Sequence, residues 1–196
     1  MLSKNIGRRR TIYALGKDLP LDEKAVVQLI EDCVLHCPTA FNMQSARTVI
    51  LFRQSHADFW KMVEKEAVAA ASSEKKEQAM KNIRRFSEAY ATILFYEDSD
   101  VVKEFAAKFP LYRQNMETWA MQANGMLEYM IWQVLAENGI GASLQHYTEL
   151  VETQTSRHFN LPKSWKMVAQ MPFGSIVRPA AEKTFLPLAD RVKIFR

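Results

Sequence analysis

Three polar segments of the sequence carry side chains suited to holding a phosphorylated heteroaromatic ligand. Arg8-Arg9-Arg10-Thr11 offers guanidinium forks and a hydroxyl, the groups that grip a phosphate monoester through paired hydrogen bonds. Segment 38–44 contains Asn42 and Gln44, whose amides can pair with the polar edge of a heteroaromatic ring. Segment 139–147 begins with small residues, which let the backbone approach a flat ring closely, and ends in a polar turn.

Each segment also has a purely structural interpretation. A run of arginines is commonly solvated surface charge. Asn42 and Gln44 can serve only to satisfy backbone groups of their loop, and the glycines at 139 and 141 can serve only to close a helix and thin a strand. Residue types and spacing alone therefore leave open whether the three segments share one ligand site.

The common catalytic and metal-binding motifs are missing from the sequence. It contains no GxGxxG, GxxxxGK, GxSxG or HExxH pattern. Cys33 and Cys37 lie on one apolar helical stripe, whereas His36 is rotated away from it. We therefore interpret the two cysteines as core residues rather than as ligands of a soft metal, and we predict no metal site.

The bulk composition predicts one globular domain over residues 1–196. Apolar residues make up 48% and charged residues 24% of the chain, which is typical of a folded protein of this length. No apolar stretch reaches the roughly 18 residues of a membrane span, the start has no signal-peptide core, and the cysteines form no disulfide framework, so we expect a cytoplasmic location. The aromatic residues are not interleaved with the basic ones, so we expect no nucleic-acid partner.

Periodicity predicts the elements of the first half of the chain. The apolar stripe from Val26 to Cys37 indicates a helix that ends at Pro38. Segments 48–52 and 91–96 are β-branched and apolar, which is typical of buried strands. The region between them is rich in Ala, Glu, Lys and Met and predicts helices over 56–71 and 75–86.

The second half is predicted in the same way. Segment 116–137 is a helix apolar on most sides, which indicates burial in a core or at a subunit interface. A short strand over 140–144, a helix over 149–159 and a strand over 165–171 that stops at Pro172-Phe173-Gly174 are expected to follow. Alternating residues predict a half-exposed strand over 191–195. Together these elements predict a helix-rich α+β fold.

Six ordered segments resemble the nitroreductase family of flavoproteins. The resemblance is to its compact branch, which includes the fungal fatty-acid repression mutant proteins and the copper-induced bacterial nitroreductases. The matching segments are Arg9-Arg10-Thr11-Ile12-Tyr13, Pro38-Thr39-Ala40-Phe41-Asn42-Met43-Gln44-Ser45-Ala46-Arg47, Tyr90-Ala91-Thr92-Ile93-Leu94-Phe95-Tyr96-Glu97-Asp98, Asn124-Gly125-Met126-Leu127, Gly139-Ile140-Gly141-Ala142-Ser143-Leu144-Gln145-His146-Tyr147 and Ala169-Gln170-Met171-Pro172-Phe173-Gly174.

The resemblance implies a nitroreductase-like α+β fold with a central, mainly antiparallel sheet wrapped by helices. It also implies an intertwined homodimer with two sites for flavin mononucleotide (FMN) across the subunit interface. Helix 116–137 would then form the dimer core, and segment 191–195 would be a candidate for pairing with the partner's sheet.

The family's FMN-binding residues carry over by position. Arg9, Arg10, Thr11 and Tyr13 fall where the family holds the phosphate, the ribityl chain and the pyrimidine edge. The partner's loop that meets the flavin corresponds to Pro38, Thr39, Ala40, Asn42 and Gln44. Cofactor contacts are further implied for Asn82 and Arg85 at the polar ring edge, for Gln145, His146 and Tyr147 near the reactive nitrogen, and for Lys183 as a second phosphate cation.

This chain departs from the larger bacterial members at two of these positions. Tyr13 stands where they carry a basic residue, and His146 stands close to the position of their acidic residue. Relatives in the compact branch often have glycine where this chain has Ala91. These differences favour the compact branch.

The resemblance implies a reductase that takes hydride from NADH or NADPH and passes electrons to nitro or quinone compounds in two half-reactions. The flavin would carry the redox chemistry, so no catalytic side chain is expected. The alternative is a flavin-binding redox sensor or regulatory protein with little turnover.

Overall fold

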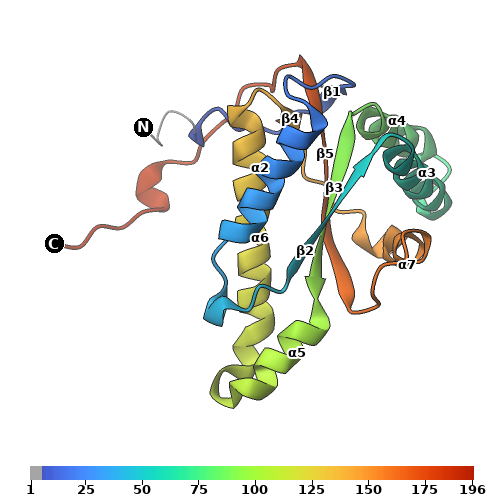
Figure 1. Ribbon diagram of the computed structural model, residues 1–196. Coiled ribbons are helices and arrows are strands. Elements are labelled where there is room, and N and C mark those ends of the chain that lie inside the picture. The colour runs from blue at the N-terminus through green and yellow to red at the C-terminus, as the bar shows by residue number, and fades with distance from the viewer. Residues whose placement is uncertain (1–5) are drawn as a thin grey trace.

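A five-stranded sheet forms the centre of the computed structural model, which describes residues 6–196 (Figure 1). Its strand order is β1-β5-β3-β2, and β4 also pairs with β5. Every strand pair is antiparallel, and a single parallel bridge joins Thr11 to Ala142, so the expected mainly antiparallel sheet is confirmed. The strands are β1 (Ala14–Gly16), β2 (Ala46–Phe52), β3 (Ala91–Asp98), β4 (Gly141–Ala142) and β5 (Trp165–Arg178).

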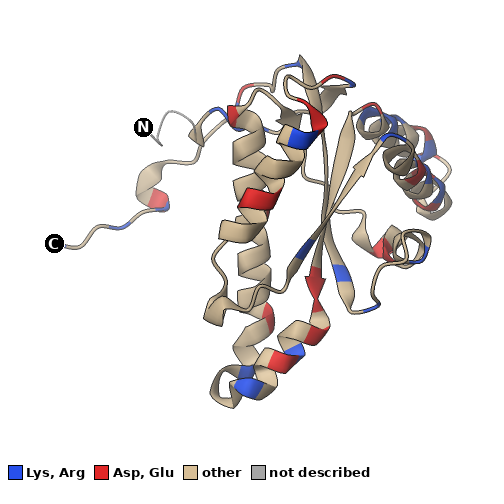
Figure 2. Cartoon of the chain, in the orientation of Figure 1, with Lys and Arg blue, Asp and Glu red and all other residues tan. Residues whose placement is uncertain are grey.

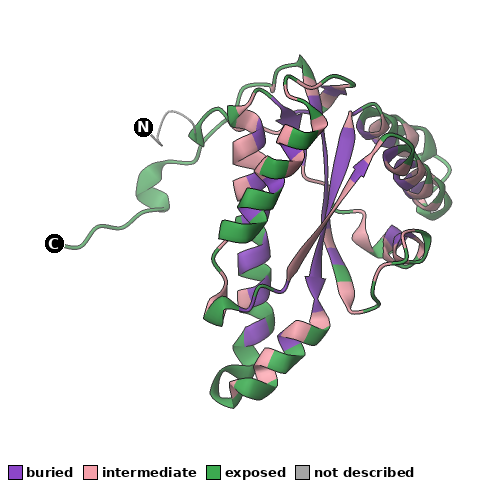
Figure 3. Ribbon diagram, in the orientation of Figure 1, coloured by how far each residue is buried: buried purple, intermediate pink, exposed green. Residues whose placement is uncertain are grey.

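Helices cover both faces of this sheet. One face packs against α2 (Glu23–His36) and α6 (Met116–Glu137), and the other packs against α3 (Arg53–Ala70), α4 (Lys76–Ser87) and α7 (Thr148–His158) (Figure 1). Because β3 is covered on both sides, all eight of its residues are buried (Figure 3). The α5 helix (Ser99–Lys108) and a 3-10 turn, η2 (Pro110–Asn115), connect β3 to α6.

The predicted α2 helix is confirmed, and its ends have clear chemical causes. The Asp22 side chain caps the N-terminus by accepting a hydrogen bond from the Ala25 N–H at 2.8 Å. Val26, Ile30 and Cys33 form its buried stripe, and Pro38 follows the C-cap residue Cys37. The chain therefore enters segment 38–44 at the end of α2 that lies away from β1 (Figure 1).

The β5 strand is longer than predicted, because Pro172-Phe173-Gly174 does not end it. Pro172 lies opposite Thr92 in the β3–β5 register, and its carbonyl accepts a hydrogen bond from the Ser143 N–H. A Cβ on Gly174 would lie 2.1 Å from the Gly16 carbonyl oxygen, so a glycine is needed where β1 pairs with β5. β5 therefore continues through Pro172-Phe173-Gly174, and Gly174 lets the backbone of β1 lie close to it.

The predicted strand over 191–195 is wrong for the single chain. The structure has no strand there, and every residue from 181 to 196 is exposed (Figure 3). A strand needs a neighbour that accepts and donates its backbone hydrogen bonds, and the tail has none within the described chain. The strand predicted over 140–144 shortens to β4, whereas β1 and α5 were not predicted at all.

Candidate functional site

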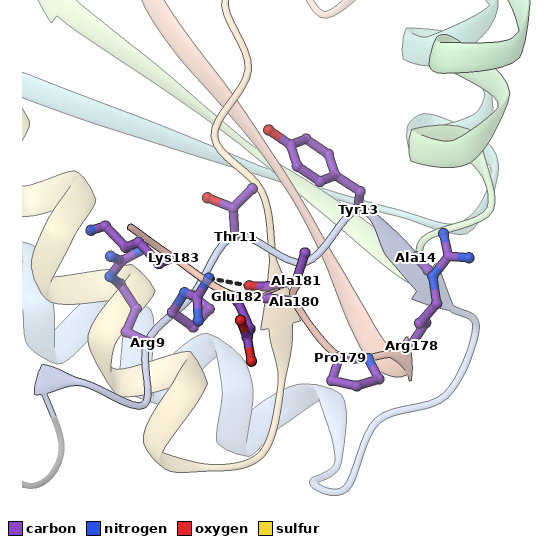
Figure 4. Close-up of a pocket in the computed structure, with 11 residues that line it drawn as sticks. Arg9, Thr11, Tyr13, Ala14, Arg178, Pro179, Ala180, Ala181, Glu182 and Lys183 are labelled. Atoms are coloured by element: carbon purple, nitrogen blue, oxygen red, sulfur yellow. Dashed lines mark hydrogen bonds between the residues drawn. The ribbon is translucent and has the colours of Figure 1, made fainter. Parts of the chain in front are cut away.

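The N-terminal basic segment and the start of the C-terminal tail together form a pocket of about 530 Å³ (Figure 4). This volume lies within the range of roughly 300–1,000 Å³ that is usual for small-molecule sites. Of the residues predicted to hold FMN, five line it: Arg9, Arg10, Thr11, Tyr13 and Lys183. The structure therefore brings together side chains that lie about 170 positions apart in the sequence, since Arg10 and Ala181 are separated by 171.

The pocket is strongly cationic. Arg9, Arg10, Arg178 and Lys183 line it, and Glu182 is its one lining carboxylate. In the view of Figure 4, Arg9 and Lys183 lie at one end and Arg178 at the other, beside Ala14. Four cations against one acidic group favour an anionic ligand, and guanidinium forks suit a phosphate.

Arg10 ties the two halves of the pocket together. Its Nη2 donates a hydrogen bond to the Ala181 carbonyl oxygen at 2.5 Å, drawn as the dashed line in Figure 4. The contact fixes the start of the tail, and Lys183 follows two residues later. The position of Lys183 therefore depends on a contact made by the N-terminal segment.

Segment 141–147 runs beside Thr11. The Ile12 N–H donates to the Ala142 carbonyl at 3.0 Å, and Thr11 forms the parallel bridge with Ala142. Gln145 then bridges to Gln170 through two backbone hydrogen bonds of 2.7 and 2.9 Å. The same sheet thus holds this predicted turn close to Thr11 and the residues predicted to bind phosphate.

The three turn residues predicted to contact the flavin, Gln145, His146 and Tyr147, differ in whether their backbone N–H groups are already hydrogen-bonded. The backbone N–H of Gln145 bonds to Gln170, and that of Tyr147 bonds to the Gln170 side-chain oxygen at 2.8 Å. The Tyr147 ring turns into the core, where it meets Trp60 edge to face. His146 is exposed, and among the described residues its N–H has no partner. His146 therefore supplies the free backbone donor of the turn.

Segment 38–44 forms a strained loop with exposed amides. Phe41, Asn42 and Gln44 have φ angles of 53°, 55° and 50°, in the left-handed region that non-glycine residues rarely occupy. The Thr39 hydroxyl accepts a hydrogen bond from the Gln44 N–H at 3.1 Å, and the buried Met43 anchors the loop to the core. Strain of this kind persists only where neighbouring contacts enforce it, and it is common at binding sites.

Arg47 provides the main anchor of this loop. Its Nη1 donates to the Gln44 carbonyl at 2.7 Å, while its Nη2 contacts the Asp98 carboxylate at 3.1 Å. Burial alone would raise the pKa of Asp98, but hydrogen bonds from Ser164, from the Asp100 N–H and from Arg47 together lower it. The carboxylate thus stays charged and holds the Arg47 fork in place.

The loop and the pocket do not meet within one chain. Cys37, at the start of the loop, contacts the Ala123 carbonyl on α6, whereas Arg9 lies against Trp132 of the same helix. From Ala123 to Trp132 the helix rises about 14 Å, at 1.5 Å per residue. Loop residues Pro38, Thr39, Ala40, Asn42 and Gln44 are therefore separated from the pocket that their predicted ligand would occupy.

Asn82 and Arg85 also lie outside the pocket. They belong to α4, which packs against β1, and Asn82 accepts a hydrogen bond from Gln78 at 2.9 Å. Arg84 pairs with Glu64, whereas the neighbouring Arg85 is exposed. Both predicted residues thus lie on an element adjacent to the pocket rather than in its lining.

Sequence reasoning missed one pocket cation, Arg178. The residue pairs with Ala14 at the end of β5, in the part of the strand hidden by the expected stop at Gly174. The run Ser175-Ile176-Val177 is rich in β-branched residues and would have indicated that the strand continues to Arg178.

Other kinds of site find little support in the described residues. Within 6–196, no group of three or more His, Cys, Asp or Glu side chains is placed to hold a metal ion. Burial raises the pKa of Cys33 to about 11, so this thiol stays protonated, as in a core residue. None of the helices described is long and apolar enough to cross a membrane.

Comparison with known proteins identifies the family. The profile of the nitroreductase family matches residues 6–175. HBN1 of Saccharomyces cerevisiae is 32% identical over 98% of this chain and 95% of its own length. The nitroreductase CinD from Lactococcus lactis, solved with 4-nitrophenol, is 41% identical with a TM-score of 0.91 over the whole of both chains.

A more distant structure shares the fold. It is a nitroreductase-type protein of Desulfovibrio desulfuricans in complex with FMN, 16% identical with a TM-score of 0.73 over 100% of this chain and 98% of its own. The relatives at higher identity are a yeast protein and CinD, as the expected compact branch predicts. This chain belongs to the nitroreductase family.

Proposed function

We propose that this protein binds FMN as a homodimer and uses it to pass electrons from NADH or NADPH to nitroaromatic or quinone acceptors. The observation that carries the proposal is the convergence of Arg9, Arg10, Thr11 and Lys183 on one cationic pocket beside segment 141–147. Membership of the nitroreductase family supplies the reaction class.

The residues of the pocket fit a phosphorylated flavin. Arg9, Arg10 and Lys183, with Arg178 in addition, would neutralise the phosphate, and the Thr11 hydroxyl would bond to the ribityl chain. Tyr13 is 55% exposed and would present its phenol toward the ring. Asn82 and Arg85 on the neighbouring α4 would reach the polar edge of the ring, where a positive charge favours the reduced, anionic cofactor.

When bound, the flavin accepts hydride and releases electrons, and the protein positions it. The free N–H of His146 would donate toward the reactive nitrogen, because the N–H groups of Gln145 and Tyr147 are already paired. No acid or base side chain is required of the protein for this chemistry.

A second copy of the chain would complete the site. Because the 38–44 loop is remote from its own pocket, its exposed Asn42 and Gln44 amides would meet the flavin of the partner. The face of α6 that is exposed in the single chain carries Met121, Met126 and Tyr129, each more than 40% exposed, and Gly125 has no neighbour within 4 Å of an added Cβ. Figure 2 shows few charged residues along α6, in contrast to α3 and α4. Such a face suits close packing against a second helix.

The C-terminal tail would extend this interface. Only β3 pairs with β2, so one edge of β2 is open among the described residues. A groove of about 610 Å³ beside it is lined by Glu31 and Asp32, which complement Arg191 and Lys193 of the tail. Segment 191–195 of the partner would form its strand on this edge, where its backbone groups gain the partners that they lack in one chain.

The first test of the proposal is flavin binding followed by redox turnover. Purified protein should show flavin absorbance, or acquire it on titration with FMN. Anaerobic NADH or NADPH should then bleach the flavin, and 4-nitrophenol or a quinone should restore its colour rapidly. Protein that gains no flavin absorbance would overturn the proposal.

A different result would favour the alternative role. If the flavin binds and is reduced but is not reoxidised by either acceptor over minutes, the protein acts as a flavin-binding redox sensor rather than as a reductase. Flavin binding and reoxidation of the flavin by the acceptor are therefore measured in separate experiments.

A further inference from the structure

Trp132 contacts Arg9, which lines the pocket, although Trp132 is not itself a lining residue. It belongs to α6 and packs against the core that lies between this helix and the sheet. The Cζ atom of Arg9 lies 4.4 Å from the centroid of the Trp132 ring. At this distance the face of the indole attracts the guanidinium by a cation–π interaction.

The surroundings of Arg9 show that the indole is its principal contact. Among residues 6–196 Arg9 has no carboxylate partner, and its Nε is a buried atom without a hydrogen-bond partner. The terminal nitrogens are not among the buried atoms and remain accessible from the pocket. Arg9 is thus held by a π face while its fork stays free for a ligand.

Arg10 is held in a different way. One of its terminal nitrogens is already engaged by the Ala181 carbonyl. Of the two adjacent guanidinium groups, Arg9 is therefore the one with both terminal nitrogens free to bind an anion through paired hydrogen bonds. The long arginine side chain loses rotamer entropy when it binds a ligand, and it loses less if a neighbouring group already restricts it in the free protein.

From this geometry we infer that Trp132 is a positioning residue for phosphate recognition. Its indole orients the Arg9 guanidinium so that the free fork faces the phosphate of the flavin. The inference rests on the proposed function, because it takes FMN as the ligand. It adds a residue from the dimer-core helix to a site otherwise built from the N-terminal segment and the tail.

The test compares FMN with riboflavin, which has the same ring system but no phosphate. Apoprotein of the wild type, Trp132→Leu, Trp132→Phe and Trp132→Met is titrated with both flavins, and inorganic phosphate is used as a competitor of FMN. Val134→Ala is the matched control, since Val134 is likewise a partly buried residue of α6 that packs against the same core but does not line the pocket. Circular dichroism and thermal unfolding establish that each variant is folded.

We expect Trp132→Leu to weaken FMN binding by about twofold to tenfold, because the Arg9 side chain must then be ordered on binding at a cost of roughly 0.5–1.5 kcal/mol. The inhibition constant of phosphate should rise by a similar factor, while riboflavin affinity changes less than twofold. Trp132→Phe keeps an aromatic face and should bind FMN more tightly than Trp132→Met. If the Leu variant does not fold, this comparison of the Phe and Met variants tests the role of the aromatic face.

Equal losses for FMN and riboflavin would overturn the inference, because Trp132 would then only support the fold. An unchanged FMN affinity in Trp132→Leu, or equal affinities in the Phe and Met variants, would overturn it too. If the wild type binds neither flavin, the proposed function itself has failed, and the two failures are distinguishable.

Discussion

Replacing Arg10 by alanine tests both halves of the pocket at once. The change removes a guanidinium predicted to bind the phosphate, and a charge-assisted hydrogen bond of this kind is worth roughly 1.5–3 kcal/mol. It also removes the bond to the Ala181 carbonyl, which fixes the segment that carries Lys183. That bond is exposed, so we assign it only about 0.5–1 kcal/mol.

Together these losses amount to about 2–4 kcal/mol, which corresponds to an FMN dissociation constant roughly 30 to several hundred times higher. Titration of apoprotein followed by flavin fluorescence measures the constant. Arg10→Lys keeps the charge but loses the planar fork, and we expect its affinity to fall between those of the wild type and the alanine variant.

Lys103→Ala is the matched control, because Lys103 is an exposed cation of α5 whose Nζ donates to the Asp100 carboxylate at 3.1 Å. It does not line the pocket. If Arg10→Ala binds FMN within twofold of the wild type, or if Lys103→Ala loses affinity equally, the assignment of the pocket is wrong.

Three further predictions concern assembly and stability. Gly125→Leu fills the open position on α6 and should give a monomer with weakened FMN binding in sedimentation and titration experiments; an unchanged dimer would contradict the proposed interface. Gly174→Ala should lower the free energy of unfolding in urea by about 3 kcal/mol or more, since its Cβ would collide with backbone, whereas Gly7→Ala, which meets nothing within 4 Å, should be nearly neutral. Burial raises the pKa of Glu128 from 4.5 to about 7, so the folded state binds the proton more tightly and stability falls as the pH rises from 4.5 through 7. Glu128→Gln should abolish this decline and be more stable than the wild type at pH 8 by about 3 kcal/mol, with little difference at pH 4.5; an equal difference at both pH values in urea unfolding would refute this account.

Local patterns in the sequence determined most of the elements. The stripe of Val26, Ile30 and Cys33 and the apolar run over 91–96 were enough to predict α2 and β3. A helix buried on one face has apolar residues three or four positions apart, whereas a strand buried on both faces is apolar throughout. The ordered motifs also identified the family, and the family profile confirms it.

Patterns failed where a residue has a role that depends on a distant segment. Gly174 was interpreted as a stop, yet its missing Cβ lets the backbone of Gly16 approach β5, and the expected stop also hid Arg178. The alternation over 191–195 predicted a strand that one chain cannot form, since backbone groups need a neighbouring strand that local sequence does not supply.

The sequence by itself predicted which groups would contact the ligand: the guanidinium groups of Arg9 and Arg10, the amides of the 38–44 loop and the turn at His146. Only the tertiary structure decided which of them meet. It joined Arg10 to Ala181, placed Arg9 on the face of Trp132, and set the loop about 14 Å along α6 from the pocket, so that one chain holds two separate parts of the proposed site. The physical reason is that contacts between distant segments follow from how the helices and strands pack, which no local pattern of residues encodes.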